Sequence, residues 1–340
     1  MSKELIYRNE NGSIKIKKYE ALFKDKLISL FINSDIDELN SLNIFFESIL
    51  TNENTKDKIE SLISNNEKIQ IFILEDNSEL IGLYFLNKTK EDPYISFIID
   101  KSQRNKGYGK LGLFLLISEL SSLYPNIQEY FFKLNKKNIF ANLIILGNNA
   151  EIITETETEI TYKIQSKNKI WIHRIGIGDM SEVMKITNQA KDLLKKSGSL
   201  QWQQGYPNEE TFTKDIKNNS LYGLFQDKDL IAFGAYIYGK DLNYVEIEGK
   251  WDIPANDKDM AIHRVAVEEN SHGKKLGEKI LKYGIQYARK LGCVTVKVDT
   301  HRINIPMQKS ILKSGFVYKG IIRVDTDKLD NLRYAYEIVL

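Results

Sequence analysis

The stretch Arg104-Asn105-Lys106-Gly107-Tyr108-Gly109-Lys110 decides how this chain is interpreted. It lies between an apolar run, residues 94–100, and a segment of helical periodicity that begins at Gly107. The first amides of a helix have no intrahelical partner and carry the positive end of the helix dipole, so a strand, turn and helix in this order favour anions. Glycine lets an oxygen-rich ligand approach the backbone, and the basic side chains add positive charge. The stretch therefore predicts a phosphate-binding loop.

Residues 107–112 also spell G-x-G-x-x-G, the dinucleotide fingerprint. In that motif the first glycine follows the strand almost directly, and an acidic residue ends the next strand. Here six residues separate Asp100 from Gly107, and the next strand-like run ends at Leu134 without an acid. A dinucleotide site is therefore not predicted, and no Walker A pattern is present.

A second copy of the pattern stands in the other half of the chain. A strand-like run at residues 261–267 is followed by His272-Gly273-Lys274-Lys275-Leu276-Gly277 and by a helical segment. Gly109 and Gly277 are 168 residues apart, and Ile99 and Val267 are separated by the same 168. Such self-similarity indicates an internal repeat.

Both copies resemble motif A of the GNAT superfamily of N-acetyltransferases, whose loop reads Q/R-x-x-G-x-G/A. The first copy fits it with Arg104, Gly107 and Gly109, whereas the second departs from it at His272 and Lys275. The C-terminal half also resembles a narrower set of bacterial GNAT domains. The residues that carry this likeness are the loop Gln201 to Pro207, the strand Ile262 to Val267 and the run Asp299 to Gln308.

The resemblance implies an α/β (α+β) protein made of two tandem GNAT domains, residues 1–165 and 168–340. Each would be a mixed, mostly antiparallel twisted sheet with flanking helices and a splayed central strand pair. Residues 21–66 read as helical stretches with polar connections. Two hairpins are predicted around residues 76–78 and 227–228, and a closing strand pair at 317–324 and 332–339.

Composition limits the classes of partner. With 42% hydrophobic and 28% charged residues the chain reads as a folded globular protein, and 340 residues suffice for two cores. A net charge of +2 gives no reason to expect nucleic-acid binding, and no apolar run suggests a membrane span. Cys293 is the single cysteine, which excludes an intrachain disulfide and suits the cytoplasm. Histidine spacing does not predict zinc, so no metal is expected.

The resemblance also implies acyl transfer from acetyl-CoA directly to an amine. Pantetheine would lie between splayed strands, at 94–100 with 128–134 and at 261–267 with 293–299. Backbone amides there could stabilise an oxyanion. The residues expected to hold CoA are Ile99, Arg104, Asn105, Lys106, Gly107, Tyr108, Gly109, Lys110, Val265, Val267, His272, Gly273, Lys274, Lys275, Leu276, Gly277 and Asn304.

An acceptor amine with a pKa of about 10.4 must lose a proton before it attacks. Family members often use a glutamate on the central strand, but we align Pro93 and Ala261 with that position. His263, two residues along the same strand face, is the alternative base, although a hydrogen-bonded core histidine remains an equal interpretation. Glu248 and His301 are further catalytic candidates.

The resemblance places a tyrosine that assists thiolate departure seven residues after Asn304, and this sequence has Ile311 there. A thiol of pKa about 8.5 can leave with little protonation, so activity is not excluded. In the N-terminal half, Asn135, Asn138 and Gly147 do not keep the family spacing.

Aromatic residues Trp202, Tyr206 and Trp251 could wall an acceptor pocket, or pack in the core. Two functional classes therefore stay open. One is an acetyl-CoA-dependent N-acyltransferase that acts on a small-molecule or peptide amine, which His263 and the aromatic loop favour. The other is a non-catalytic acyl-CoA-binding or scaffold protein, which the missing glutamate and tyrosine favour.

Overall fold

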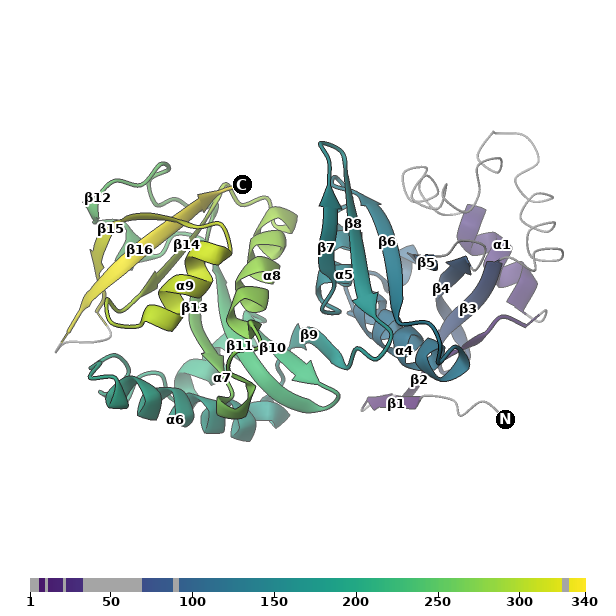
Figure 1. Cartoon of the computed structure of the whole chain (residues 1–340), viewed down its shortest axis with the longest axis horizontal. Helices are drawn as coiled ribbons and strands as arrows, with labels where there is room; N and C mark the ends of the chain where they lie inside the picture. The colour runs from purple at the N-terminus through teal and green to yellow at the C-terminus, as the bar shows by residue number, and fades with distance from the viewer. Residues whose placement is uncertain (1–5, 10–11, 21–22, 33–68, 88–91, 326–329) are drawn as a thin grey trace. The chain divides into compact units, whose positions relative to one another are not determined.

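Two sheets, one in each half of the chain, form the framework (Figure 1). The computed structural model describes residues 6–9, 12–20, 23–32, 69–87, 92–325 and 330–340. The chain divides into unit 1, Met1–Lys169, and unit 2, Ile170–Leu340. The last strand of unit 1 ends at Gln165 and the first strand of unit 2 begins at Ile170.

In unit 1 the described strands follow the order β1-β2-β3-β4-β5-β6-β8-β7 across the sheet. The strands are β1 (Ile6–Asn9), β2 (Gly12–Lys18), β3 (Ile69–Asp76), β4 (Glu79–Asn87), β5 (Tyr94–Ile99), β6 (Glu129–Asn135), β7 (Glu151–Glu155) and β8 (Glu159–Gln165), and the helices are α1 (Lys24–Ile32), α4 (Tyr108–Leu123) and α5 (Ile139–Leu146). Helix α1 falls within the predicted helical stretch 21–66; residues 21–22 and 33–66 of that prediction lie outside the described residues.

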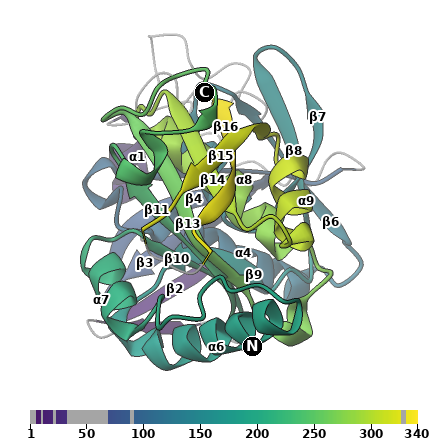
Figure 2. The ribbon, with the colours of Figure 1, turned by 90° about the vertical axis from the view of Figure 1, so that its left-hand side faces the viewer.

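In unit 2 the strand order is β12-β15-β16-β14-β13-β11-β10-β9. The strands are β9 (Ile170–Arg174), β10 (Leu221–Gln226), β11 (Asp229–Tyr238), β12 (Glu248–Gly249), β13 (Asp259–Val267), β14 (Thr295–Thr300), β15 (Val317–Arg323) and β16 (Leu332–Val339), and the helices are α6 (Met180–Lys196), α7 (Glu209–Lys217), α8 (Leu276–Lys290) and α9 (Ile305–Lys313). Figure 2, which faces unit 2, shows α6 near α7 and α8 beside α9.

The two sheets repeat one plan. The described neighbours pair antiparallel except at the centre, where β5 runs parallel to β6 and β13 runs parallel to β14. Both central pairs splay: β5 and β6 share only the registered pair Tyr94 with Phe131, and the β13–β14 register ends at Ile262 with Val298. The predicted fold class, a mixed and mostly antiparallel sheet with flanking helices and a splayed central pair, is confirmed in both units.

Alternation along the strands places helices on both faces of each sheet. Successive strand residues point to opposite faces. In β11, Gly234 lies against Ile280 of α8, whereas its neighbour Phe233 packs edge-on against Phe212 of α7, with ring centroids 5.4 Å apart. The predicted apolar face of the helix after the first loop is buried against its sheet, at Leu113, Leu116, Ile117 and Leu120.

The late helices α5 and α9 also correspond, which corrects the expectation that the N-terminal half loses the family spacing. Asn138 and Asn304 cap them in the same conformation, each accepting a hydrogen bond from the amide three residues on. Eleven residues after each cap the backbone is left-handed, at Asn149 (φ 63°) and Gly315 (φ 96°). The spacing was hidden because asparagine, which tolerates this conformation, stands where glycine was sought.

Candidate functional site

The two predicted phosphate loops, residues 104–110 and 272–277, have the same backbone course. A short 3₁₀ turn precedes each loop, at Lys101–Gln103 and at Glu269–Ser271. Left-handed residues then stand two apart, at Asn105 (φ 63°) and Gly107 (φ 91°) in the first loop. In the second they are Gly273 (φ 81°) and Lys275 (φ 58°). The first left-handed position holds asparagine in the first loop and glycine in the second, and the second position holds glycine and lysine respectively. Each loop therefore contains one residue with a Cβ in a conformation that favours glycine.

The residue that opens each loop fastens it to the central strand. Nε of Arg104 donates to the carbonyl oxygen of Ile99 at 3.1 Å, and Nε2 of His272 lies 3.2 Å from the carbonyl oxygen of Val267. The departure from the Q/R pattern at His272 therefore keeps this contact. The same carbonyls were among the backbone groups expected to pair with pantetheine, so in this structure a side chain of the loop already uses them.

Other residues of the first loop are engaged with neighbours in unit 1. Lys106 donates to Gln103, at 2.9 Å, and the Tyr108 hydroxyl donates to Asp76, at 2.7 Å. The hydrogen bond to Asp76, with burial, raises the pKa of Tyr108 to about 12. A Cβ built at Gly109 would come 2.5 Å from Cδ1 of Ile144 on α5, so this glycine allows close helix packing.

Unit 2 contains a cavity of about 940 Å³, within the range of ligand pockets. It begins at the second loop, passes the end of β13 and reaches the aromatic loop. Lys274 is not among its lining residues and lies 3.5 Å from the Ser271 hydroxyl. The lining includes the predicted site residues Trp202, Tyr206, His263, Val265, Val267, His272, Gly273, Lys275, Leu276, Gly277 and Asn304.

A bulge in β13 opens the sheet beside this cavity. Between Phe233 and Ala235 of β11 the pairing with β13 shifts by one residue, so β13 has one extra residue there. This bulge contains Arg264, whose φ is 52°. Arg264 donates Nε and Nη2 to the two oxygens of Asp215, at 2.7 and 2.9 Å, and Nη1 to the Tyr206 hydroxyl, at 2.7 Å. This bidentate pair ties the bulge to α7 and to the aromatic loop.

The cavity is also lined by His263, Asp241 and Asp299. We call these three residues, together with the buried Tyr244 that contacts them, the acceptor end. Nε2 of His263 lies 2.7 Å from Oδ2 of Asp241, and Nδ1 lies 3.9 Å from Oδ1 of Asp299. The Tyr244 hydroxyl donates to the same Asp299 oxygen at 2.7 Å, and its ring stacks on His263. Burial alone would raise the pKa of Asp241, but His263 and Asn243 together lower it to about 2.

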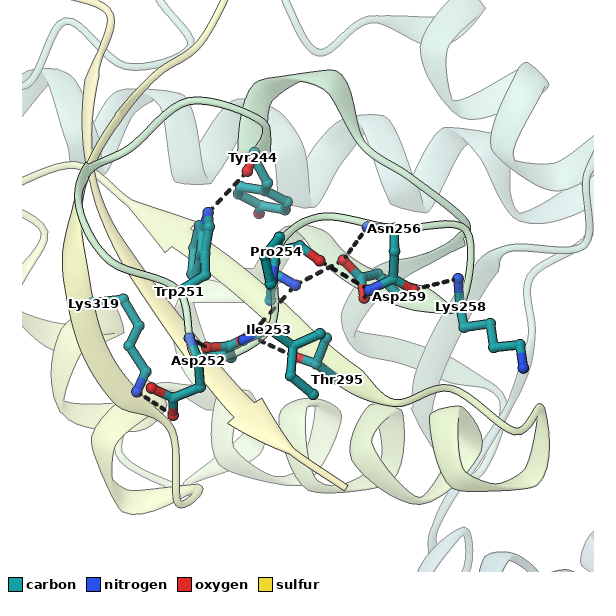
Figure 3. Close-up of polar contacts among 12 residues, drawn as sticks. Tyr244, Trp251, Asp252, Ile253, Pro254, Asn256, Lys258, Asp259, Thr295 and Lys319 are labelled. Carbon is teal, nitrogen blue, oxygen red and sulfur yellow. Dashed lines mark hydrogen bonds and ion pairs between the residues drawn. The ribbon is translucent and has the colours of Figure 1, made fainter.

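Residues 239–258, which we call the acceptor segment, supply Asp241 and Tyr244, and buried polar contacts hold the segment in place (Figure 3). The Trp251 indole donates to the Tyr244 carbonyl at 2.8 Å. Glu337 accepts from the backbone amides of residues 252 and 253, at 2.7 and 3.3 Å. At the end of the segment, Asn256 donates to Asp259 at 2.7 Å, drawn in Figure 3.

Three residues that were predicted for catalysis or substrate binding do not line the cavity. Glu248 is exposed on the short strand β12, where it pairs with Arg323 at 2.6 Å. His301 is 2% exposed and its Nε2 lies 2.7 Å from Asp330, which makes it a core histidine. Trp251 packs in a buried cluster with Tyr244 and anchors the acceptor segment.

The sequence reasoning missed Asp241, Asp299, Tyr244 and the Asp215–Arg264 pair. Asp299 could have been predicted as a site residue, because it lies near the end of the strand after the central one, and that end lines the cavity. Asp241 and Tyr244 gave no signal, because they lie in an irregular connection with no periodic pattern.

Unit 1 has no counterpart of the acceptor end among its described residues. Through the strand pairings, Ser96 stands where unit 2 has His263, because Ser96 pairs with Phe85 as His263 pairs with Ala235. This register also corrects the sequence alignment: Tyr94, not Pro93, is the counterpart of Ala261. Lys133 takes the place of Asp299.

Two other features concern cofactors and location. The only cysteine, Cys293, is buried, and burial together with Asp259 raises its thiol pKa to about 11. Within the part of the chain that the structure describes, no group of three or more His, Cys, Asp or Glu could hold a metal ion. Nor does any helix in that part have the length and apolar character needed to cross a membrane.

Among curated proteins, the chain is similar to a phosphoribosylaminoimidazole-succinocarboxamide synthase from Wigglesworthia glossinidia brevipalpis. The identity is 32% over 133 residues, which is 38% of this chain and 46% of that protein. The chain therefore spans less than half the length of this relative.

Solved structures and a family model were also compared. A GNAT-family acetyltransferase from Streptococcus agalactiae is 26% identical, with 51% of this chain and 96% of that one covered and a TM-score of 0.46. The PaiA N-acetyltransferase from Thermoplasma acidophilum, in complex with coenzyme A, is 16% identical, with 50% and 99% covered and a TM-score of 0.39. The model of the acetyltransferase (GNAT) family matches residues 187–316, which include the second loop, the bulge and His263. Over residues 187–316, the chain is therefore similar to the acetyltransferase (GNAT) family.

Proposed function

We propose that unit 2 is an acetyl-CoA-dependent N-acyltransferase that transfers an acetyl group directly to a primary amine of a small molecule or peptide. One observation carries the proposal. The loop at the start of α8, which favours anions, and His263 on β13 line the same cavity. A transferase needs both ends, because the acyl donor and the amine must meet within one site.

The lining of the cavity fits coenzyme A. Lysines 275, 309 and 313 line the loop end, where the phosphates of CoA would be held. A Cβ at Gly273 would meet no atom within 4 Å, so the backbone there is open to a ligand. Beyond Ile262 the described register between β13 and β14 ends, so the backbone of Val265 on that side would pair with an extended pantetheine. At Val267, the ligand would compete with the His272 side chain for the carbonyl.

His263 is the proposed general base. Its ring lines the cavity and is 18% exposed, so an amine can reach it. An imidazole has an ordinary pKa of about 6.5, which suits proton transfer near neutral pH. The Cys293 thiol is buried and does not line the cavity, so it is not proposed as an acyl carrier.

The second candidate, a non-catalytic acyl-CoA-binding or scaffold role, is favoured for unit 1 by specific observations. Ser96 and Lys133 stand in place of the base and of Asp299, as the strand pairings indicate. Ile144 of α5 lies beside Gly109, in the same way that Ser310 of α9 lies beside Gly277. We propose that unit 1 binds the phosphates of acyl-CoA through its loop without performing transfer.

The test is steady-state thiol release from acetyl-CoA across a panel of primary amines with the full chain. We expect His263→Ala to abolish release, and Gly273→Glu, which places an anion in the second loop, to prevent it by weakening acetyl-CoA binding. Gly107→Lys, in the first loop, should cost far less activity than Gly273→Glu. If the wild-type chain releases no thiol with any amine, the enzyme proposal fails.

A further inference from the structure

Hydrogen bonding fixes which nitrogen of His263 can act as a base. Nε2 lies 2.7 Å from a carboxylate oxygen of Asp241. Asp241 has a pKa of about 2, so its carboxylate is ionised at neutral pH and can only accept a hydrogen bond. Nε2 therefore carries the proton of the neutral ring. Nδ1 is left with the lone pair, and no hydrogen bond to it from a described residue is present.

Asp299 is the second acceptor at this place. Its side chain is 11% exposed and lines the cavity. The Tyr244 hydroxyl donates to Oδ1, and within the described residues this is the one hydrogen bond that reaches the carboxylate. Tyr244 is 1% exposed, so the phenol is fixed and holds the carboxylate towards His263. Asp299 thus keeps unused acceptor capacity on the cavity side.

The spacing of the two acceptors suits one cationic nitrogen. Nδ1 of His263 and Oδ1 of Asp299 are 3.9 Å apart. Because a hydrogen bond from an ammonium is about 2.8 Å long, one nitrogen can lie at that distance from both atoms. The charge agrees: Arg264 is paired with Asp215, which leaves Asp241 and Asp299 as carboxylates beside the ring. Arg333, also in the lining, directs Nη1 to two backbone carbonyls.

We propose that the acceptor end takes its amine as the ammonium ion, held between Nδ1 of His263 and the carboxylate of Asp299. This inference rests on the proposed transferase function of unit 2. The substrate class is then an aliphatic primary amine that is cationic at neutral pH. Asp299 is a specificity-determining residue, and Asp241 is a positioning residue that sets the tautomer of His263.

The protons balance in this arrangement. His263 Nδ1 takes one proton from R–NH₃⁺ and becomes an imidazolium that still donates from Nε2 to Asp241. The freed amine forms the C–N bond to the acetyl carbon while the C–S bond breaks. The second proton of the nitrogen goes to the departing thiolate. The imidazolium then returns its proton to water, so the products are an amide, CoA thiol and one proton.

The experiment compares two acceptors of the same length: an alkylamine that is protonated at pH 7.5, and a fluorinated alkylamine that is neutral there. We expect Asp299→Asn to raise KM for the protonated amine about 10- to 100-fold, as for loss of a hydrogen bond to a charged group, and to change KM for the neutral amine less than about threefold. Asp241→Asn should lower kcat about tenfold or more, since an amide can stabilise the wrong tautomer, with little change in KM.

The pH profile gives a readout that a structural role would not move. The titratable groups that face His263 are Asp241, Asp299 and Tyr244, with the Asp215–Arg264 pair beyond them. We expect the acid limb of kcat against pH to shift in Asp241→Asn and to stay in place in Asp229→Asn, which neutralises an exposed carboxylate on β11 far from the lining.

The outcomes separate the inference from the function beneath it. Absence of thiol release from the wild type with every amine overturns the transferase itself. Release by the wild type, with Asp299→Asn changing KM equally for both amines or for neither, overturns the ammonium site alone. Tryptophan-fluorescence melts identify any variant that fails to fold; Asp299→Glu, which keeps the charge, should then retain discrimination between the two amines and replaces the failed variant.

Discussion

Replacing Lys275 by glycine should stabilise unit 2, although it removes a charged side chain from a predicted binding loop. Lys275 is exposed and holds φ at 58° and ψ at 26° at the start of α8. A residue with a Cβ pays about 1–2 kcal/mol for the left-handed conformation, which glycine adopts freely. Glycine also gains freedom in the unfolded chain, so the net gain expected is about 1 kcal/mol. For a unit of this size that corresponds to a rise in Tm of about 2–4 °C.

Tryptophan fluorescence measures this change in the right unit, because Trp171, Trp202 and Trp251 are all buried in unit 2. Lys275→Ala is the matched control: it removes the same charge but keeps the Cβ, so it should not stabilise. If Lys275→Ala raises Tm as much as Lys275→Gly, charge repulsion and not backbone strain is the cause. If Lys275→Gly leaves Tm unchanged or lowers it, the reasoning is refuted. In unit 1, Gly107→Ala should lower the free energy of unfolding by about 1 kcal/mol, because Gly107 has a left-handed backbone. The added Cβ would meet no atom within 4 Å, so a steric clash does not contribute to this loss.

Three further outcomes can be measured on the same material. Asp215→Ala leaves Arg264 buried without its bidentate partner, and urea unfolding followed by tryptophan fluorescence should show a loss of about 3–5 kcal/mol; a loss below 1 kcal/mol would mean that water reaches the guanidinium. Since the pKa of Asp241 is lowered to about 2, its ionised form adds stability above about pH 4 that disappears as the pH falls towards 2. The stability difference between wild type and Asp241→Asn should therefore shrink between about pH 4 and pH 2, and a constant difference would contradict this. The Cys293 thiol, with its pKa raised to about 11, should not react with a thiol reagent at pH 8 until the protein unfolds; rapid reaction of the native chain would show that the connection between α8 and β14 opens locally.

The sequence alone could predict the repeat and the two loops from their residues, whereas the splayed sheets were implied by the family resemblance. Glycines at helix starts and alternating apolar residues have physical causes within a few neighbouring residues. The exchange of glycine positions, Asn105 with Gly107 against Gly273 with Lys275, was not predictable, since asparagine and lysine do not reveal a positive φ. The bulge at Arg264 was not predicted for the same reason. Because the bulge adds one residue to β13, the sequence alignment matched Ala261 with Pro93 instead of Tyr94.

The acceptor end lay beyond sequence reasoning for a different reason. His263 could be selected because it lies on the central strand, where acetyltransferases carry a base. Its partners come from separate places in the chain: Asp241 from an irregular connection and Asp299 from the end of the next strand. Their meeting depends on buried polar contacts such as Glu337 with the backbone of the acceptor segment, and no pattern in one stretch encodes such contacts. Glu248 and His301, in contrast, had suitable chemistry but packed elsewhere.

The single registered pair between Tyr94 and Phe131 has a mechanical consequence for unit 1. Strands β1 to β5 and strands β6 to β8 are nearly two separate sheets, and few backbone hydrogen bonds cross the seam between them. Amide deuterium uptake should be fastest along that seam. An extended ligand that forms hydrogen bonds with both β5 and β6 would connect the two parts of the sheet. Ligand binding should therefore slow amide exchange along this same seam.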